Sequence, residues 1–486
     1  MIIKELNRNK IPKTIDNLVE VSKKIIHNMP ETSRLAITLP LLGHIVSFKH
    51  IAVDEYNNGK NIKPFNIMVF SFVKSGGGKD RLKDFHLKHT LKTPYKIIDD
   101  YVKEYNAQRL SMLEEKLKSC PKGDNFHKGL IQNEILALRQ VELVINSCTK
   151  EGFTSDAEVI SQMPKGSIIV FDGEVGITLT SKDEKSKNVI DCLIQAFDGK
   201  LPSKSTKKEN IKRDKVINII VNSLMFSDPE FLKDYNTSKL FKRIMETGMI
   251  RRAFITYQEN LIRTIIENPD EEYELIRQAY KESEIIDEQI TKMFMKIPDN
   301  AVYVLPKGVL LKTFAPYKKE LTEKFNATKN SLERKEILSR ELKALKMATF
   351  CACLNHPNEL VINDIDFEQG IYITEFLSQD YTNFLDFASP YNDFYARVFK
   401  FLLENLNKTF YKTTLINAHK TIEISRRYFR SNFIDILEGV SEMAQMYGYE
   451  LKVDKSYNDN ETYKLVKILT PEEIAELNKR LEVDVI

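Results

Sequence analysis

The sequence lacks the features that would place it in a membrane or in an oxidising compartment. It has five cysteines among 486 residues, and they form no CxxC pair. No histidines stand at zinc-ligand spacing, so we expect reduced thiols without a disulfide framework or structural metal. No segment approaches the roughly 20 apolar residues of a membrane span, and the first ten residues are charged where a signal peptide would be apolar. These absences predict a soluble, cytoplasmic protein, located in the host cytoplasm if a phage encodes it.

The chain also lacks a strong net charge. Its 72 Lys and Arg residues and 69 Asp and Glu residues leave a formal charge of +3. Any contact with nucleic acid must therefore come from local clusters of basic residues. Hydrophobic residues make up 42% of the sequence and charged residues 29%, which is typical of soluble globular proteins. The length suffices for two or three packed units.

The segment most informative about chemistry runs from residue 66 to residue 80. An apolar, strand-like stretch, Ile67–Phe72, is followed closely by three glycines, a lysine and an aspartate. Consecutive glycines allow backbone N–H groups to converge on an anion, and a lysine at the start of the next helix adds positive charge. We therefore predict an ATP site. The residues predicted to bind the nucleotide are Ser75, Gly76, Gly77, Gly78, Lys79, Asp80 and Arg81.

This glycine loop, residues 75–80, departs from the common phosphate-binding pattern G-x-x-x-x-G-K-[ST]. Val73 stands where the first glycine belongs, and Asp80 replaces the hydroxyl residue. A glycine-rich turn after a buried strand is the structural alternative. The residues downstream favour the phosphate-binding interpretation.

Strand-like and helix-like stretches alternate from residue 66 to residue 257. The predicted strands are 67–72, 141–146, 167–171, 216–221 and 252–257, and the predicted helices are 81–118, 155–163, 187–197 and 229–246. This alternation predicts an α/β fold with a parallel sheet and ligands at the carboxyl ends of its strands. We expect a RecA/AAA-like, additional-strand P-loop NTPase core.

Four regions follow from these patterns. An N-terminal helical segment spans 1–60, the ATPase core 61–260, a helical lid 261–388, and a C-terminal helical region 389–486. The charges of the long helical stretch 318–354 are expected to form a solvated face. The last region ends in a strand-like pair around a polar turn at 456–461, which makes a winged-helix-like domain one interpretation.

A second motif supplies carboxylates. The run Ser-Ile-Ile-Val-Phe-Asp-Gly-Glu at 167–174 places Asp172 and Glu174 at the end of a predicted strand. ATP hydrolysis needs one carboxylate near Mg²⁺ and another that orients the attacking water. We assign Asp172, with Asp80, to the metal and Glu174 to the water. The alternative is a buried strand that ends in a polar turn.

Two further positions are candidates for catalysis. Asn222 follows the fourth predicted strand and is expected to contact the γ-phosphate, with simple capping of the strand as the alternative. Arg251 and Arg252 stand at the start of the fifth predicted strand, and a strand buried on both faces has no place for two arginines without a charged partner. Either arginine is a candidate finger that completes the site of a neighbouring subunit. An ion pair at the strand edge is the other possibility.

These motifs resemble those of phage and mobile-element ATPases described as helicase-like or primase-associated. The resemblance rests on Ser75–Asp80, on Glu151–Thr154 leading to Ile169–Asp172, and on Thr247–Arg252, with a similar helical stretch from Ser339 to Leu377. It covers residues from about 20 to about 380. The resemblance implies ATP hydrolysis by a ring or partial ring that acts on DNA during replication.

Two basic clusters predict a nucleic-acid partner. The first lies in the loop 200–215 and the second on a predicted helix that also carries Phe429. Basic loops and interleaved aromatic residues suit contacts with the backbone and bases of single-stranded DNA. A solvated loop and a core position for Phe429 are the respective alternatives. The basic residues concerned are Lys204, Lys207, Lys208, Lys212, Arg213, Arg426, Arg427 and Arg430.

The sequence thus favours an ATP- and Mg²⁺-dependent, helicase-like motor. Its expected partners are single-stranded DNA, copies of itself in a homo-oligomer such as a hexameric ring, and replication proteins. One alternative is a nucleotide-gated scaffold or loader, or a defence or virion-associated ATPase that separates no strands. A small-molecule kinase is disfavoured, because no acceptor pocket is evident.

Overall fold

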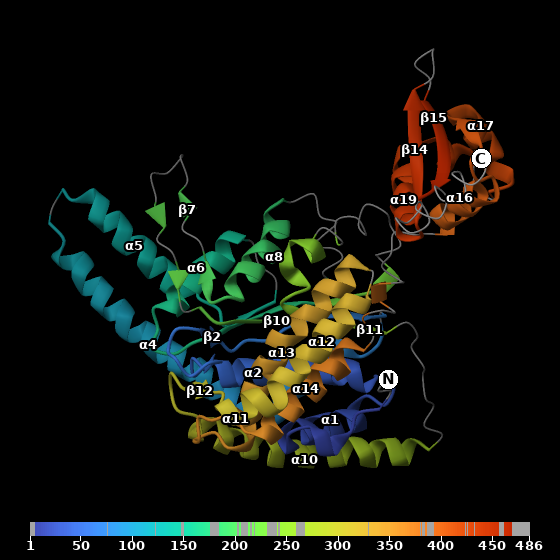
Figure 1. Cartoon of the computed structure of the whole chain (residues 1–486). Helices are drawn as coiled ribbons and strands as arrows, with labels where there is room; N and C mark the ends of the chain where they lie inside the picture. Colours follow the sequence, from blue (N-terminus) through green and yellow to red (C-terminus); the bar gives the residue numbers. More distant parts are fainter. Residues whose placement is uncertain are drawn as a thin grey trace. The chain divides into compact units, whose positions relative to one another are not determined.

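Figure 1 shows a computed structural model of the chain. It describes residues 5–468 except 75, 122, 147–149, 175–183, 202–203, 206–211, 214–215, 218, 231–240, 242–243, 259–267, 329, 380, 382–383, 386–392, 423, 425, 432 and 456–460. The chain divides into two compact units. The first comprises Met1–Phe231 and Leu240–Phe387, and the second comprises Leu232–Lys239 and Ala388–Ile486.

A parallel sheet of five strands forms the centre of the first unit. The strand order across the sheet is β11 (Ala253–Gln258), β3 (Met68–Val73), β10 (Val221–Ser227), β5 (Ile168–Asp172) and β4 (Val144–Ile145). All residues of β3, β10 and β11 are buried, as expected for parallel strands covered on both faces. The predicted α/β class and parallel sheet are therefore confirmed.

Helices cover both sides of this sheet. In Figure 1, α2 (Glu31–Ser47) runs below the strands, whereas α6 (Lys150–Ser161) and α8 (Glu184–Ala196) lie above them. Nearly every residue of α2 is buried, and the helix contacts four of the five strands. The N-terminal region 1–60 thus packs in the same unit as the sheet.

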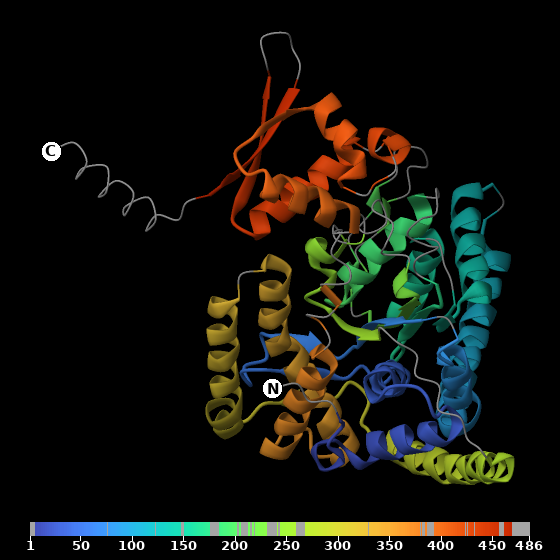
Figure 2. The same ribbon diagram turned by 90° about the vertical axis from the view of Figure 1, so that its right-hand side faces the viewer.

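Further helices surround this core. A helical hairpin of α4 (Lys92–Ser119) and α5 (Asn125–Gln140) projects from it, and α10 (Pro269–Lys296) packs along α1 (Lys13–Ile25) (Figures 1 and 2). The helices α13 (Ser331–Asn355) and α14 (Asp364–Ser378) lie side by side. A Cβ at Gly370 of α14 would lie 2.4 Å from the backbone nitrogen of Ala348, so this close packing requires glycine.

Shorter elements connect these parts of the first unit. They are η1 (Arg8–Lys10), β1 (Ala52–Asp54), β2 (Ile62–Pro64), α3 (Lys79–Phe85), η2 (His86–Thr90), β6 (Lys200–Leu201), β7 (Lys204–Ser205), β8 (Lys212–Arg213), β9 (Val216–Ile217), η4 (Met245–Met249), β12 (Val302–Val304), α11 (Lys307–Val309), η5 (Leu310–Phe314) and α12 (Ala315–Ala327).

The second unit is built from helices and a three-stranded antiparallel sheet. The helices are α16 (Asp393–Glu404), α17 (Lys412–Asn417), η6 (Ala418–Lys420), α18 (Arg426–Ser431) and α19 (Phe433–Met446). The sheet order is β13 (Thr409–Tyr411), β15 (Glu461–Lys467), β14 (Tyr449–Lys455). The predicted pair of strands around residues 456–461 is confirmed, whereas β13 was not predicted.

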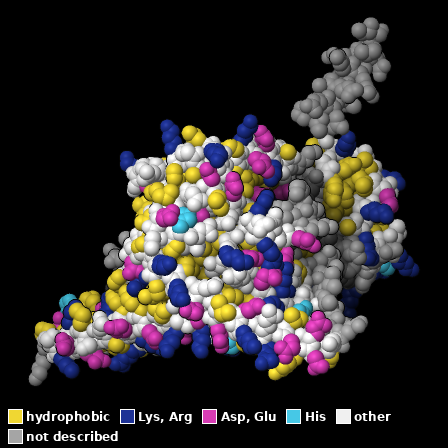
Figure 3. Space-filling model, turned by 90° about the horizontal axis from the view of Figure 1, so that it is seen from below, with side chains coloured by type: hydrophobic (Ala, Val, Ile, Leu, Met, Phe, Trp, Pro, Cys, Tyr) yellow, Lys and Arg dark blue, Asp and Glu magenta, His cyan; other side chains and the backbone are white. Residues whose placement is uncertain are grey.

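No described helix combines the length and the apolar composition that crossing a lipid bilayer requires. The side chains on the face shown in Figure 3 agree with this finding. Basic and acidic groups alternate over that face, with apolar side chains between them.

Candidate nucleotide site

The glycine loop connects the carboxyl end of β3 with helix α3. Gly76 and Gly78 adopt φ angles of +84° and +78°, in the left-handed region that favours glycine. The backbone N–H of Gly77 donates to the carbonyl of Lys74 at 3.1 Å and closes a turn. Ser75 lies outside the described residues. Gly76 and Gly78 are therefore needed for the shape of this loop, which ends where α3 begins at Lys79.

The N-terminal helices α1 and α2 hold the glycine loop in position. A Cβ at Gly78 would lie 3.0 Å from two side-chain carbons of Ile26, which follows α1. The buried guanidinium of Arg34 in α2 donates to the carbonyls of Ser22 and Ile26 and so fixes the end of α1. His86 of η2 contacts Thr38 of α2 at 3.3 Å, and burial lowers its pKa to about 3. Helix α2 thus holds in position the end of α1, which contacts Gly78, and η2, which follows α3.

Lys79 joins the glycine loop to the acidic motif. Its side chain is only 8% exposed, and its Nζ donates to the carbonyl of Gly173 at 2.9 Å and to Oε1 of Glu174 at 3.2 Å. The ring of Phe226, in β10, lies 5.5 Å from the ammonium group. The two motifs, about 95 residues apart in the sequence, therefore meet at the carboxyl edge of the sheet, as the alternation of strands and helices predicted.

The two carboxylates of the acidic motif lie at the end of β5. Asp172 is the last residue of the strand, and its Oδ1 accepts a hydrogen bond from the backbone N–H of Glu174 at 3.0 Å. This turn directs the chain from the strand towards Lys79. Glu174 is exposed, so it is accessible to water.

Asp80 and Arg81 occupy the first turn of α3 with exposed side chains. Among the described residues, no three His, Cys, Asp or Glu side chains are grouped closely enough to hold a metal by themselves. Magnesium bound with a nucleotide needs only one or two protein carboxylates, because phosphates and waters complete its shell. Asp80 and Asp172 fit that requirement in residue type, and their role as metal ligands stays a prediction.

The structure corrects the position of Asn222. The strand was predicted to end there, but β10 begins at Val221 and runs to Ser227. Asn222 is therefore at the amino end of the strand, about 16 Å from the carboxyl end at 3.3 Å per residue. Its buried side chain accepts from the N–H of Ile67 at 2.9 Å and donates to Ser47 at 2.8 Å. Asn222 links two strands to α2 and cannot reach a phosphate at the glycine loop.

Ser227 and Asp228 lie at the carboxyl end of β10, where Asn222 was predicted to be. Ser227 ends β10 beside β3 and β5, and a carboxylate oxygen of Asp228 accepts from the N–H of Glu230 at 3.0 Å. Glu230 lies 3.6 Å from the ammonium group of Lys74, which precedes the glycine loop. The sequence signal was present, because the apolar run Leu-Met-Phe ends in Ser-Asp.

This correction gives a prediction for Asn222→Ala. The substitution leaves the buried N–H of Ile67 without its acceptor, so we expect a loss of about 1–3 kcal/mol in unfolding free energy. Catalytic turnover per folded molecule should stay near the wild-type value. Urea unfolding and ATP turnover measure the two effects. Asp228→Asn, at the opposite end of β10, should instead lower turnover and leave the unfolding free energy near the wild-type value. A turnover defect confined to Asn222→Ala would restore the original assignment.

Arg251 and Arg252 also lie at the amino edge of the sheet. They precede β11, whose Ala253 pairs with Met68 at the start of β3. Arg252 contacts a carboxylate oxygen of Asp198 at 2.5 Å and the carbonyl of Gly248 at 3.2 Å. For Arg252 the ion pair at the strand edge, the alternative to an arginine finger, is therefore present. Arg251 is exposed, and its role across a subunit boundary stays a prediction.

The first basic cluster falls partly outside the described residues, which exclude Lys207 and Lys208. The described backbone forms a short antiparallel ladder in which Lys204 of β7 pairs with Arg213 of β8, and Ser205 pairs with Lys212 (Figure 1). The segment is thus a β-hairpin and not a plain loop. Its predicted contact with DNA stays a prediction.

The second basic cluster lies on α18. Arg426, Arg427 and Arg430 are exposed, whereas Phe429 is fully buried in the core of the second unit. The core alternative for Phe429 is therefore confirmed, and its ring is not available to stack on a base.

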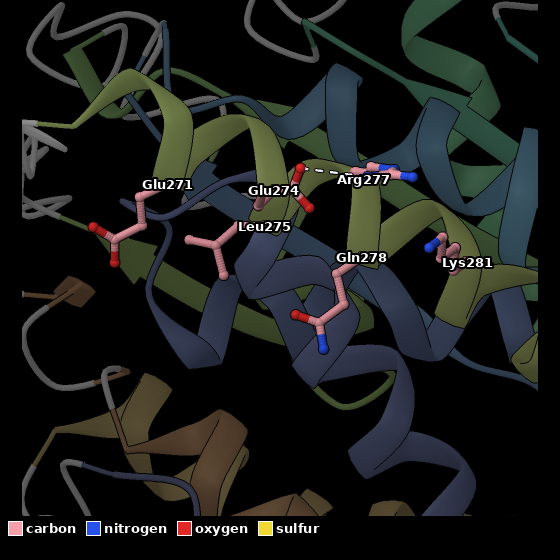
Figure 4. Close-up of a pocket in the computed structure, with 6 residues that line it drawn as sticks. All are labelled: Glu271, Glu274, Leu275, Arg277, Gln278 and Lys281. Atoms are coloured by element: carbon pink, nitrogen blue, oxygen red, sulfur yellow. Dashed lines mark hydrogen bonds and ion pairs between the residues drawn. The ribbon is translucent and has the colours of Figure 1, made fainter.

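A separate hollow on the surface of α10 carries no comparable chemistry. Six residues of this one helix line it, and Arg277 lies 3.4 Å from Glu274 (Figure 4). These side chains lie along an exposed helix, with no strand end or glycine turn among them. We therefore assign the candidate site to the glycine loop.

In comparisons with known proteins, no protein-family model matches this chain, and no curated protein matches it in sequence. The resemblance to helicase-like ATPases rests on the quoted motifs. The arrangement of Lys79, Asp172 and Glu174 carries the functional argument.

Proposed function

We propose that this protein is a P-loop ATPase of the additional-strand type that acts as a motor on DNA. The observation that carries the proposal is the contact of Lys79 with the end of β5. A cation, a glycine loop and two carboxylates converge there at the carboxyl edge of a parallel sheet, where α/β folds bind ligands.

The strand order supports the additional-strand assignment. In that type of ATPase, one strand lies between the strand before the phosphate loop and the strand that carries the acidic residues. Here β10 lies between β3 and β5 and pairs with both in parallel. Its carboxyl end, at Ser227 and Asp228, would be the polar strand end nearest the γ-phosphate.

Each site residue has a role in this proposal. The N–H groups of Gly76–Gly78 and the ammonium group of Lys79 bind the β- and γ-phosphates. Asp80 and Asp172 would hold Mg²⁺, and that ion would supply positive charge for the phosphates. Glu174 orients and deprotonates the attacking water. In the present structure Glu174 is paired with Lys79, so phosphate binding would free this carboxylate by taking over its partner.

The partners follow from the basic segments and from the resemblance. Single-stranded DNA would contact the β7–β8 hairpin, and Arg251 would complete a neighbour's site in a homo-oligomer such as a hexameric ring. A cytoplasmic setting, and replication proteins as further partners, belong to the same proposal. The rival function is a nucleotide-gated scaffold or loader, or a defence or virion-associated ATPase without strand separation.

ATP turnover with and without single-stranded DNA tests this proposal. We expect Mg²⁺-dependent hydrolysis that single-stranded DNA stimulates several-fold, because a translocating motor couples turnover to its track. Lys207→Ala/Lys208→Ala should retain basal turnover and lose the stimulation. Hydrolysis that DNA does not stimulate, with the double variant equal to wild type, would favour the scaffold function. No hydrolysis under any of these conditions would refute the ATPase itself.

A further inference from the structure

The second unit has the element order of a winged helix-turn-helix domain. Helix α16 is followed by β13, the helical segments α17 and α18–α19, and the hairpin β14–β15. Strand β15 lies between β13 and β14 and is antiparallel to both, which closes the three-stranded sheet of that architecture. Figure 2 shows the two long strands (red) beside the helices (orange).

A core of its own holds this unit together. Buried side chains from α16, α17, α18 and α19 and from β14 and β15 form one cluster, in which the ring centres of Phe429 and Phe433 are 5.6 Å apart. A Cβ at Gly439 of α19 would lie 2.8 Å from the ring of Tyr395 in α16, so these two helices are in close contact. Outside this cluster, the described side chains of α17 and α18 are exposed.

The turn between α17 and α18 is closely defined. The N–H of Ile422 donates to the carbonyl of Ala418 at 3.0 Å, and the N–H of Ile424 donates to that of His419 at 2.9 Å. Both isoleucine side chains are buried. Arg426 donates to the side-chain oxygen of Asn417 at 3.0 Å, so it spans the turn from the second helix to the first. The order of α17, this turn and α18 is that of a helix-turn-helix motif, whose second helix reads DNA, although the segment 418–425 between the helices is longer than the usual turn of about three or four residues.

Charge on this unit is concentrated at the same place. Residues 405–431 contain six lysines and arginines and one acidic residue, Glu423. All six, Lys408, Lys412, Lys420, Arg426, Arg427 and Arg430, are exposed. The next helix, α19, carries three acidic residues and no basic one. The strands β14 and β15 and helix α16 also carry lysines and arginines, but acidic residues of the same elements largely offset them. The net positive charge of the described part of this unit is therefore concentrated on residues 405–431, as expected of a surface that meets phosphates.

We propose that the second unit binds double-stranded DNA, with α18 lying in the major groove. Arg427 and Arg430 face base edges and phosphates, while Arg426, Lys412 and Lys420 contact the backbone. Duplex is favoured over single-stranded DNA because the element order is that of a winged helix-turn-helix, whose second helix enters the major groove. The burial of Phe429 in the core also removes one of the rings that could have stacked on a base. The inference needs no ATP hydrolysis, so it stands apart from the proposed motor activity.

The test measures binding of the full chain to a fluorescent duplex of about 20 base pairs, two helical turns, by anisotropy without nucleotide. The triple variant Arg426→Ala/Arg427→Ala/Arg430→Ala should lose at least about tenfold in affinity, and its log–log salt slope should fall by up to about 3 because each phosphate contact contributes about 0.9. The matched control, Lys103→Ala/Lys292→Ala/Lys319→Ala, removes three equally exposed cations of the first unit and should bind like wild type.

Three outcomes would overturn the inference. They are equal duplex affinity of the triple variant and the control, failure of wild type to bind duplex at about 50 mM salt, or preference for single-stranded DNA of the same sequence. A protein-binding role for this surface would follow from the second. All three arginines are exposed, so circular dichroism should show a folded variant. Lys79→Ala separates the two proposals, because it should lower ATP turnover by about 10²–10³ and leave duplex binding unchanged.

Discussion

Lys79→Ala is expected to lower ATP turnover by about 10²–10³, the effect of removing one preorganised charge from a transition state. Lys79 lies between the glycine turn and the acidic strand end, and its ammonium group is already 3.2 Å from Glu174. Nucleotide affinity should fall as well, because the lost charge faces both ground-state and transition-state phosphates. Steady-state phosphate release and nucleotide titration measure the two effects.

Lys88→Ala is the matched control for this prediction. Lys88 lies further along the same helical segment, in η2, with a side chain 67% exposed and an ion pair to Asp84. Its loss should change turnover less than twofold, because surface ion pairs contribute little. Full activity of Lys79→Ala, with intact folding, would sink the assignment of the phosphate site. Equal losses in both variants would instead point to damage to the helix.

The parallel sheet could be predicted because strands buried on both faces appear as short apolar runs. The fourth strand was misplaced for the same reason. The apolar stretch from Val216 to Phe226 is longer than one strand, and Asn222 was taken to mark its end. In the fold this amide is fully buried and pairs with Ile67 and Ser47. Polarity alone does not tell a buried polar contact from a polar strand end.

The glycine loop and the acidic motif could both be predicted from the sequence. Each follows an apolar strand, and parallel strands place their carboxyl ends at one edge of the sheet. Arg252 did not follow this rule, because it precedes its strand and its partner, Asp198, follows a different helix. Which charges meet across elements depends on packing, and no spacing within the sequence specifies it.

The charged residues of α13 are a second case in which the sequence does not specify which side chains meet. They were expected to form a solvated face, but Glu336, Lys343 and Lys346 are all nearly inaccessible to solvent. The ammonium group of Lys346 donates to the side chain of Asn66, just before β3, and lies 3.5 Å from the centre of the Phe197 ring. Burial holds the pKa of Lys346 well below its ordinary value. This helix therefore attaches to the sheet through buried polar contacts.

Glu336 is the centre of one such network. Its carboxylate accepts from Arg340 at 2.8 Å, from Lys343 at 3.3 Å and from the hydroxyl of Ser378 at 3.1 Å. Lys343 also donates to the carbonyl of Ile250 at 3.2 Å, which ties α13 to the segment before β11. Burial alone would raise the pKa of Glu336, but the two cations and the hydrogen bonds hold it below its ordinary value of 4.5.

Glu336→Ala is expected to destabilise the first unit by about 3–5 kcal/mol, because it leaves buried cations without their counter-charge. The midpoint of urea unfolding, followed by circular dichroism, measures the loss. Glu288→Ala, which removes an exposed partner of Lys292 on α10, should change the midpoint little. A similar small shift for Glu336→Ala would mean that the network contributes no net stability.

The pH dependence of Glu336 gives an independent check on the same network. Its pKa is lower in the folded chain than in the unfolded one, so its contribution to stability is complete above pH 4.5 and is lost as the pH falls below that value. Glu336→Gln keeps the shape of the side chain and removes its charge. The stability difference between wild type and Glu336→Gln should therefore be constant at neutral pH and shrink in acid. A difference independent of pH down to the acid transition would show that shape, and not charge, joins α13 to the sheet.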